Sequence, residues 1–148
     1  MSTDWDRRYL DLAATVAAWS KDPSTKVGAA IVRPDKTIAS VGFNGFPRGV
    51  ADHSTRYEDR SIKYRLVTHA EVNAILSAHE PLHGYTLYVT PLHPCPQCAA
   101  AIVQAGITRV VSPRPTCNDH WSNEFAYAEL VLSEAGVQTA FIHPEDTE

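Results

Sequence analysis

Apolar residues follow a helical period near the start of the chain and then give way to two short β-rich runs. Residues 5–19 carry an apolar stripe on one side, and Asp4 is a suitable N-cap, so this segment is predicted to be an amphipathic helix. The stripe consists of Tyr9, Leu12, Val16 and Trp19. Residues 27–32 and 38–43 flank a polar turn, which predicts a β-hairpin after the helix.

The second half of the chain alternates helical and β-rich segments. Gly106 and Gly136 each follow a helical segment and predict its C-terminal end. Residues 43–61 are polar and rich in Gly and Pro, so we expect a loop there. The predicted helices are 69–78, 98–105 and 123–135, and the predicted strands are 86–90, 108–112 and 137–143.

The order of these elements, α-β-β-α-β-α-β-α-β, predicts an α/β fold with a mixed sheet. Strands joined through helices run parallel, so the last three strands should be parallel to one another. No internal repeat or low-complexity tract interrupts the pattern, and the length suits one domain over residues 1–148.

The composition is that of a folded protein and narrows the class of partner. Hydrophobic residues make up 44% of the chain and charged residues 20%, which is typical of a globular domain. The net charge of −4 argues against a polymeric nucleic-acid partner, which would favour a basic patch, and permits a small anionic substrate. We expect neither a signal peptide nor a membrane span, because no long apolar run occurs. Three cysteines give no disulfide framework and indicate a reducing, cytoplasmic setting.

Two short motifs carry the candidate chemistry, His69-Ala70-Glu71 and Pro94-Cys95-Pro96-Gln97-Cys98. Together they offer three zinc ligands, His69, Cys95 and Cys98, and a carboxylate that need not bind metal. A catalytic zinc site uses three protein ligands and leaves one position open for water, whereas a structural site is closed by four. The two cysteines are three residues apart at the start of a predicted helix, where they share a face and the helix dipole favours thiolate.

The proposed chemistry is hydrolytic deamination. His-x-Glu followed by Pro-Cys-x-x-Cys is the signature of zinc-dependent nucleobase deaminases. Zinc lowers the pKa of a bound water to about 7, and Glu71 would move protons between that water, the ring nitrogen and the departing ammonia. The alternative, a structural zinc knuckle or three unrelated core residues, would need a fourth Cys or His ligand nearby in the knuckle case.

With these residues laid out, the chain resembles the cytidine deaminase-like superfamily and, within it, the deoxycytidylate (dCMP) deaminase family. The zinc motif indicates the superfamily, while Gly-Phe-Asn-Gly-x-Pro-x-Gly together with Pro-Ser-Thr-Lys-Val-Gly-Ala narrows the resemblance to the dCMP group. The resemblance extends from about residue 5 to about residue 137, and its marks are residues 22–29, 42–49, 63–64, 69–75, 87–90 and 94–99.

The resemblance implies a three-layer α/β/α fold around a five-stranded mixed sheet and the conversion of dCMP to dUMP and ammonia, which feeds dTMP synthesis. It implies zinc held by His69, Cys95 and Cys98, with Glu71 as the proton carrier. The segment between Gly49 and His69 lacks the further Cys/His pair with which some relatives bind a second zinc, so we expect one zinc per chain. It also implies a homo-oligomer, a dimer or a hexamer, and dCTP and dTTP as effectors. Residues 113–121 depart from the family pattern.

Several further residues are candidates for substrate binding, each with a plainer alternative. Lys26 would meet the 5′-phosphate as a point charge, or would be a solvated surface residue. Asn44 resembles the family Asn that contacts the sugar or base, although Asn-Gly also favours a turn. The remaining candidates beside the zinc motifs and in the late loop, which could contact the nucleotide or serve packing, are Ala70, Pro94, His120 and Trp121.

Two other functions stay open. One is deamination of a different base or of a modified deoxycytidylate, such as 5-methyl-dCMP, tRNA adenosine or a riboflavin-pathway pyrimidine. The other is a non-catalytic zinc module that binds single-stranded nucleic acid, which the presence of Glu71 disfavours because such a module needs no proton carrier.

Overall fold

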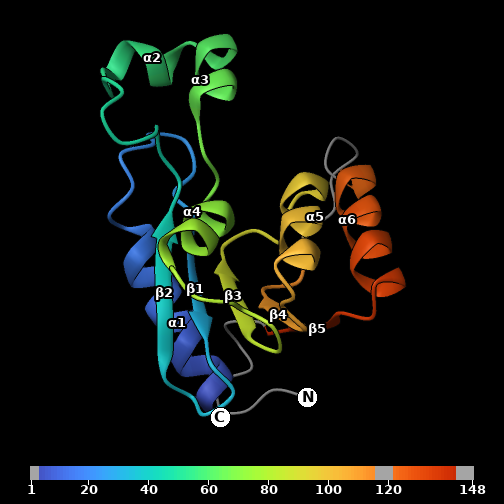
Figure 1. Cartoon of the computed structure of the whole chain (residues 1–148). Coiled ribbons are helices and arrows are strands. Elements are labelled where there is room, and N and C mark those ends of the chain that lie inside the picture. Colours follow the sequence, from blue (N-terminus) through green and yellow to red (C-terminus); the bar gives the residue numbers. More distant parts are fainter. Residues whose placement is uncertain (1–3, 116–121, 143–148) are drawn as a thin grey trace.

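A five-stranded sheet is the centre of the fold in the computed structural model, which describes residues 4–115 and 122–142 (Figure 1). Its strands are β1 (Gly28–Val32), β2 (Ile38–Phe43), β3 (Thr86–Thr90), β4 (Arg109–Ser112) and β5 (Gln138–Phe141). They lie in the order β2-β1-β3-β4-β5. Strand β1 is antiparallel to both β2 and β3, whereas β3, β4 and β5 are parallel. The predicted mixed sheet with three parallel strands at its end is confirmed.

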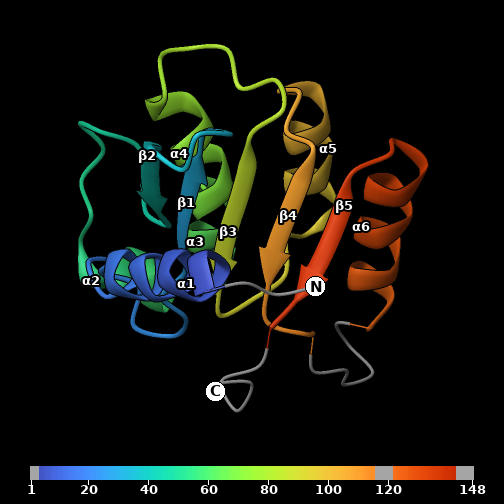
Figure 2. The same ribbon diagram turned by 90° about the horizontal axis from the view of Figure 1, so that it is seen from below.

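Helices cover both faces of this sheet and make three layers (Figure 2). The helices are α1 (Asp4–Ala17), α2 (Ser54–Glu58), α3 (Arg60–Leu66), α4 (Ala70–Ser77), α5 (Pro96–Gln104) and α6 (Ser122–Glu134). Because successive strand residues point to opposite faces, Ala30 and Val32 of β1 belong to the core on the α1 side of the sheet. Ala29 and Ile31 belong to the core on the other face, to which α4, α5 and α6 contribute. The alternation explains why β1 is buried along its whole length.

The prediction of a loop over residues 43–61 is wrong in part. The short helix α2 and the start of α3 occupy its second half. Both helices are too short to show a periodic apolar stripe, which is why the pattern missed them. Asp59 is the local signal, since its carboxylate accepts hydrogen bonds from the backbone N–H groups of Ser61 and Ile62 and caps α3.

Close approach of α4 to β2 brings the first zinc motif against the sheet. Gly42 of β2 makes this possible, because a Cβ there would lie 2.7 Å from the carbonyl oxygen of Ala70 and closer still to the nitrogen of Ala74. Ser40 adds a hydrogen bond from its hydroxyl to the carbonyl of Ala74, 2.6 Å long. The strand therefore packs closely against the first half of the helix that carries the candidate catalytic carboxylate.

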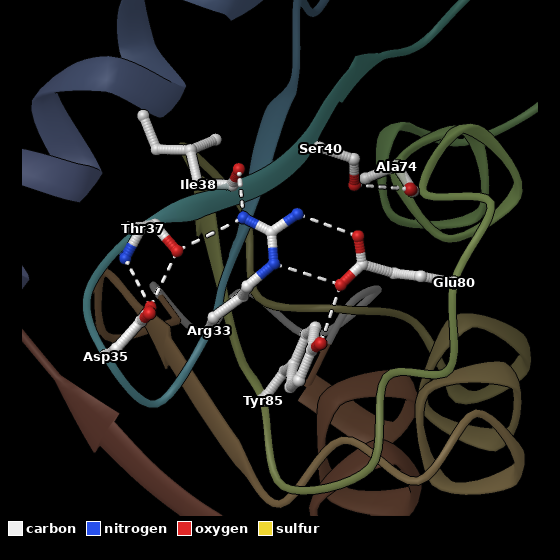
Figure 3. A network of polar contacts seen from close by, with 8 residues as sticks. All are labelled: Arg33, Asp35, Thr37, Ile38, Ser40, Ala74, Glu80 and Tyr85. Carbon is white, nitrogen blue, oxygen red and sulfur yellow. Dashed lines mark hydrogen bonds and ion pairs between the residues drawn. The ribbon is translucent and has the colours of Figure 1, made fainter.

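A polar network outside the site ties the β1–β2 hairpin to the segment that follows α4 (Figure 3). The Arg33 guanidinium donates to both oxygens of Glu80, at 3.0 and 2.7 Å, and Tyr85 donates to the same carboxylate at 2.6 Å. These hydrogen bonds lower the pKa of Glu80.

Among the helices of the described ranges, none combines the length and the apolar character that a membrane span requires.

Candidate active site and metal centre

His69, Cys95 and Cys98 come together although the two motifs are more than twenty residues apart. His69 occupies the N-cap position of α4, and Cys95 the N-cap position of α5, so the amino ends of two helices meet at one point. The Nδ1 atom of His69 lies 3.2 Å from Cys98 Sγ and 3.6 Å from Cys95 Sγ. In the described part of the chain these three side chains are the group able to hold a metal ion, with their ligand atoms within 4.8 Å of one another.

The spacing of these atoms is close to that around a tetrahedral zinc ion. Bonds of about 2.3 Å to sulfur and about 2.0–2.1 Å to nitrogen put ligand atoms roughly 3.5–3.8 Å apart around such an ion. The 3.6 Å contact of His69 with Cys95 lies in this range, and the 3.2 Å contact with Cys98 is shorter. Cys95 also accepts a hydrogen bond from the backbone N–H of Cys98 at 3.5 Å. A hydrogen bond from the Cys98 thiol, helped by His69, lowers the pKa of the Cys95 thiol well below its usual range. One ligand is thus already poised as the thiolate that zinc requires.

Glu71 lies in the first turn of α4, beside the ligands and outside their cluster. Its side chain is only 4% exposed. Burial raises the pKa of Glu71 to about 6, against the opposing effect of backbone N–H groups and His69. A carboxyl group with that pKa can both accept and release a proton near neutral pH.

A cavity of about 320 Å³ opens onto this cluster. Its walls come from the segment before β1, from α3, from the start of α4, from the loop before α5 and from Phe125 of α6. The volume is at the lower end of the range of small-molecule sites. His69, Glu71 and Cys95 all line it, so a ligand in the cavity would meet the metal site and the carboxylate together.

The other predicted site residues divide into several groups. Ala70 and Asn44 line the cavity. Pro94 is buried and Lys26 is exposed, and neither residue lines the cavity. His120 and Trp121 lie outside the described residues.

The side-chain amide of Asn44 is engaged within the protein. Its oxygen accepts a hydrogen bond from the backbone N–H of Val27 at 2.9 Å. Its nitrogen donates to the carbonyl of Thr25 at 3.0 Å and to the carboxylate of Asp22 at 3.3 Å. Both amide hydrogens are therefore used in holding the cavity wall, and a contact with substrate stays a prediction.

The sequence reasoning missed a buried ion pair in the same wall. Lys63 of α3 lies 2.9 and 3.0 Å from the two carboxylate oxygens of Asp22, whose side chain is 2% exposed. The same carboxylate accepts hydrogen bonds from the backbone N–H groups of Ser24 and Thr25. Lys63 belongs to a segment that carries the family resemblance, but no local pattern connects it with a carboxylate 41 residues away.

His93 is a further cavity residue outside the predicted set, although its place directly before the second zinc motif made it the histidine to watch. It lines the cavity, is 3% exposed, and has Nδ1 3.1 Å from the hydroxyl of Ser112. That hydroxyl donates its only hydrogen to the carbonyl of Pro113, so Nδ1 must be the donor to Ser112. Nε2 is then a bare acceptor, and it has no hydrogen-bond partner among the described residues. Burial lowers the pKa of His93 to about 4, which keeps the ring neutral at pH 7.

Comparisons with known proteins agree with this geometry. The family profile for the "Cytidine and deoxycytidylate deaminase zinc-binding region" matches residues 3–113. An uncharacterized deaminase in the luxG 3′ region of Aliivibrio fischeri is 43% identical over 144 residues, covering 96% of each chain. Human deoxycytidylate deaminase is 36% identical over 140 residues, which cover 90% of this chain and 77% of the human protein. Among solved structures, dCMP deaminase of the cyanophage S-TIM5 in its apo form has a TM-score of 0.75 at 28% identity, covering 96% of this chain and 100% of the phage enzyme.

Proposed function

Because this chain belongs to the cytidine and deoxycytidylate deaminase zinc-binding family, we propose that it hydrolyses dCMP to dUMP and ammonia. The observation that carries the proposal is one cavity lined by a three-ligand metal site and a buried carboxylate outside that site. Three ligands leave a coordination position for water, which is the mark of a catalytic rather than a structural zinc site. Similarity to deoxycytidylate deaminases over most of the chain supports dCMP as the substrate.

In this proposal His69, Cys95 and Cys98 hold one zinc ion. When bound, zinc supplies an activated water by lowering the pKa of that water to about 7. Glu71 would take one proton from the attacking water and deliver it to the ring nitrogen. It would then take the proton of the hydroxyl group added to the ring carbon and pass it to the departing amine, so that both protons of the water are accounted for as the C–N bond breaks. The buried position of Glu71 keeps bulk water away from these transfers.

The walls would orient the pyrimidine and the sugar. Ala70, which is fully buried beside His69, and Pro94, which precedes Cys95, are the candidates for contact with the base. Asn44 is the candidate for contact with the sugar or base through the remaining lone pair of its amide oxygen. His120 and Trp121 remain candidates for closing over the nucleotide from the segment outside the described residues.

We also infer a homo-oligomer of at least two subunits and, by similarity with the family, regulation by dCTP and dTTP. Light scattering tests the first inference, and a monomeric mass at assay concentration rejects it. Titration of each triphosphate into the assay tests the second, which fails if neither changes the rate. Cytoplasmic residence is inferred from the free thiols of Cys95 and Cys98, which must stay reduced to bind zinc.

The decisive experiment follows ultraviolet absorbance as zinc-loaded protein meets dCMP, with deoxycytidine, dCTP and 5-methyl-dCMP run in parallel. We expect turnover of dCMP and little turnover of deoxycytidine. The variant Glu71→Gln should keep its fold and one zinc per chain but lose about 10²–10⁴-fold or more in kcat, because the amide cannot exchange the proton. Full activity of Glu71→Gln refutes the mechanism, and failure of the wild-type protein to convert dCMP refutes the substrate.

A further inference from the structure

The cations near the cavity differ in whether a neighbouring acid already neutralises their charge. Lys63 lines the cavity, but it is paired with Asp22. Lys26 is exposed and does not line the cavity. Arg60, the first residue of α3, lines the cavity, is exposed, and makes no ion pair or hydrogen bond to any described residue. In the described ranges Arg60 is thus the cavity-lining Lys or Arg whose charge remains available for a ligand.

Two hydroxyl groups accompany Arg60 along this wall. Ser24 and Thr25 line the same cavity, and the described residues leave both hydroxyls without a hydrogen bond. Their backbone N–H groups donate to Asp22, which also holds Lys63. The buried ion pair therefore ties the segment before β1, which carries the two hydroxyls, to α3, which carries the guanidinium.

The part of the wall that comes from the loop before α5 and from α6 is mainly apolar. Leu92 and Phe125 are apolar, and His93 adds a bare acceptor nitrogen there. A phosphate dianion has only acceptor oxygens to offer, so it gains nothing from this surface. Helix α3 lies above β1 and β2 in the view of Figure 1, whereas α6 lies on the β5 side of the sheet.

We propose that Arg60 binds the 5′-phosphate of the nucleotide, with the hydroxyls of Ser24 and Thr25 as additional donors, and that this contact selects the nucleotide over the nucleoside. This inference rests on the proposed dCMP deaminase function. A guanidinium presents two parallel N–H donors that match two phosphate oxygens, which makes it a stronger and more directional partner than an ammonium. The assignment replaces Lys26 by Arg60 as the principal phosphate cation.

The test compares Arg60→Met, which removes the charge and keeps most of the side-chain length, with Arg60→Lys and with Lys26→Met as the matched control. Hydrogen bonds to charged groups predict that Arg60→Met raises the KM for dCMP about 10- to 100-fold. Its kcat should stay within a few-fold of wild type, and the low kcat/KM for deoxycytidine should not change. Arg60→Lys should recover part of the affinity, and Lys26→Met should behave as wild type. Zinc content and the melting temperature of each variant verify that the fold is intact.

Equilibrium binding separates this inference from the proposed reaction. Calorimetry with dUMP and with deoxyuridine needs no turnover, so it reports on Arg60 even if the deamination assay shows no activity. A preference of the wild-type protein for dUMP that Arg60→Met abolishes supports the assignment. The assignment is overturned if the wild type binds dUMP and deoxyuridine equally, or if Arg60→Met keeps the preference and Lys26→Met loses it.

Discussion

Replacing Lys63 by Met should destabilise the protein strongly, because it strips a buried carboxylate of its counter-ion. Asp22 is 2% exposed, so water cannot replace the lost ammonium group. Three N–H donors would remain on the carboxylate, from the backbone of Ser24 and Thr25 and from the side chain of Asn44. Hydrogen bonds of this kind offset part of the charge but not all of it.

The expected magnitude follows from this geometry. Truncating one partner of a buried ion pair costs about 3–5 kcal/mol, and the three remaining donors put Lys63→Met near the lower end, at about 3 kcal/mol. A domain of about 150 residues loses roughly 3–4 °C in melting temperature per kcal/mol, which corresponds to a fall of about 10 °C. The wall that carries Ser24 and Thr25 would also loosen, so the KM for the nucleotide should rise.

Urea unfolding of the zinc-loaded protein, followed by circular dichroism, measures the effect. Lys21→Met is the matched control, because Lys21 pairs with Asp52 at 2.6 Å on the surface, where the two side chains are 69% and 46% exposed. Exposed pairs contribute little, so the control should unfold at the wild-type urea concentration within error. Equal midpoints for the two variants would falsify the idea that burial makes the Asp22 pair essential.

Three further predictions test other parts of the structure. Gly42→Ala should lower the free energy of unfolding by about 1–3 kcal/mol and reduce turnover, because the added Cβ pushes α4 away from β2. The control is Gly45→Ala, whose Cβ would meet nothing closer than 3.7 Å. Equal urea midpoints for the two variants would contradict this reasoning. Hydrogen bonds lower the folded-state pKa of Glu80 below its usual 4.5. The contribution of ionised Glu80 to stability is therefore present above pH 4.5 and is lost as the pH falls through the folded-state pKa. The difference in unfolding free energy between wild type and Glu80→Gln should shrink on acidification, and a difference that stays constant in denaturation curves across this pH range rejects the assignment. Cys98→Ser should weaken zinc binding at least about 100-fold, measured by competition with a chelator, since losing even an outer partner of a ligand costs about 10–100-fold. The third cysteine, Cys117, belongs to neither zinc motif and lies outside the described residues, and Cys117→Ser is expected to keep wild-type affinity. Parallel loss in both variants would mean that Cys98 has no special role.

The fold class and the metal site were accessible from the chain alone because both depend on local spacing. The period at which apolar side chains recur along the chain distinguishes helices from strands. The order of the elements then predicted the parallel arrangement of β3, β4 and β5. The ligand types and their separation along the chain were enough to predict a three-ligand zinc site. The distances among His69, Cys95 and Cys98 agree with that prediction.

The short helices over residues 54–66 were not accessible in this way, since each has too few turns to produce a periodic pattern. These helices matter for the site, because α3 brings both Lys63 and Arg60 to the cavity. From the sequence, Lys26 was a candidate for the phosphate, with a solvated surface residue as the alternative, and the structure leaves that side chain exposed and outside the cavity lining.

The sequence by itself determined which groups could do the chemistry, namely a zinc triad and a carboxylate on the amino ends of two helices. Only the tertiary structure decided which charges are neutralised and which remain available. The pairing of Lys63 with Asp22 spans 41 residues, and the amide of Asn44 is engaged by a residue 22 positions away. Contacts at such separations depend on how the elements pack, so no local pattern contains them, and they shape the wall against which a nucleotide would bind.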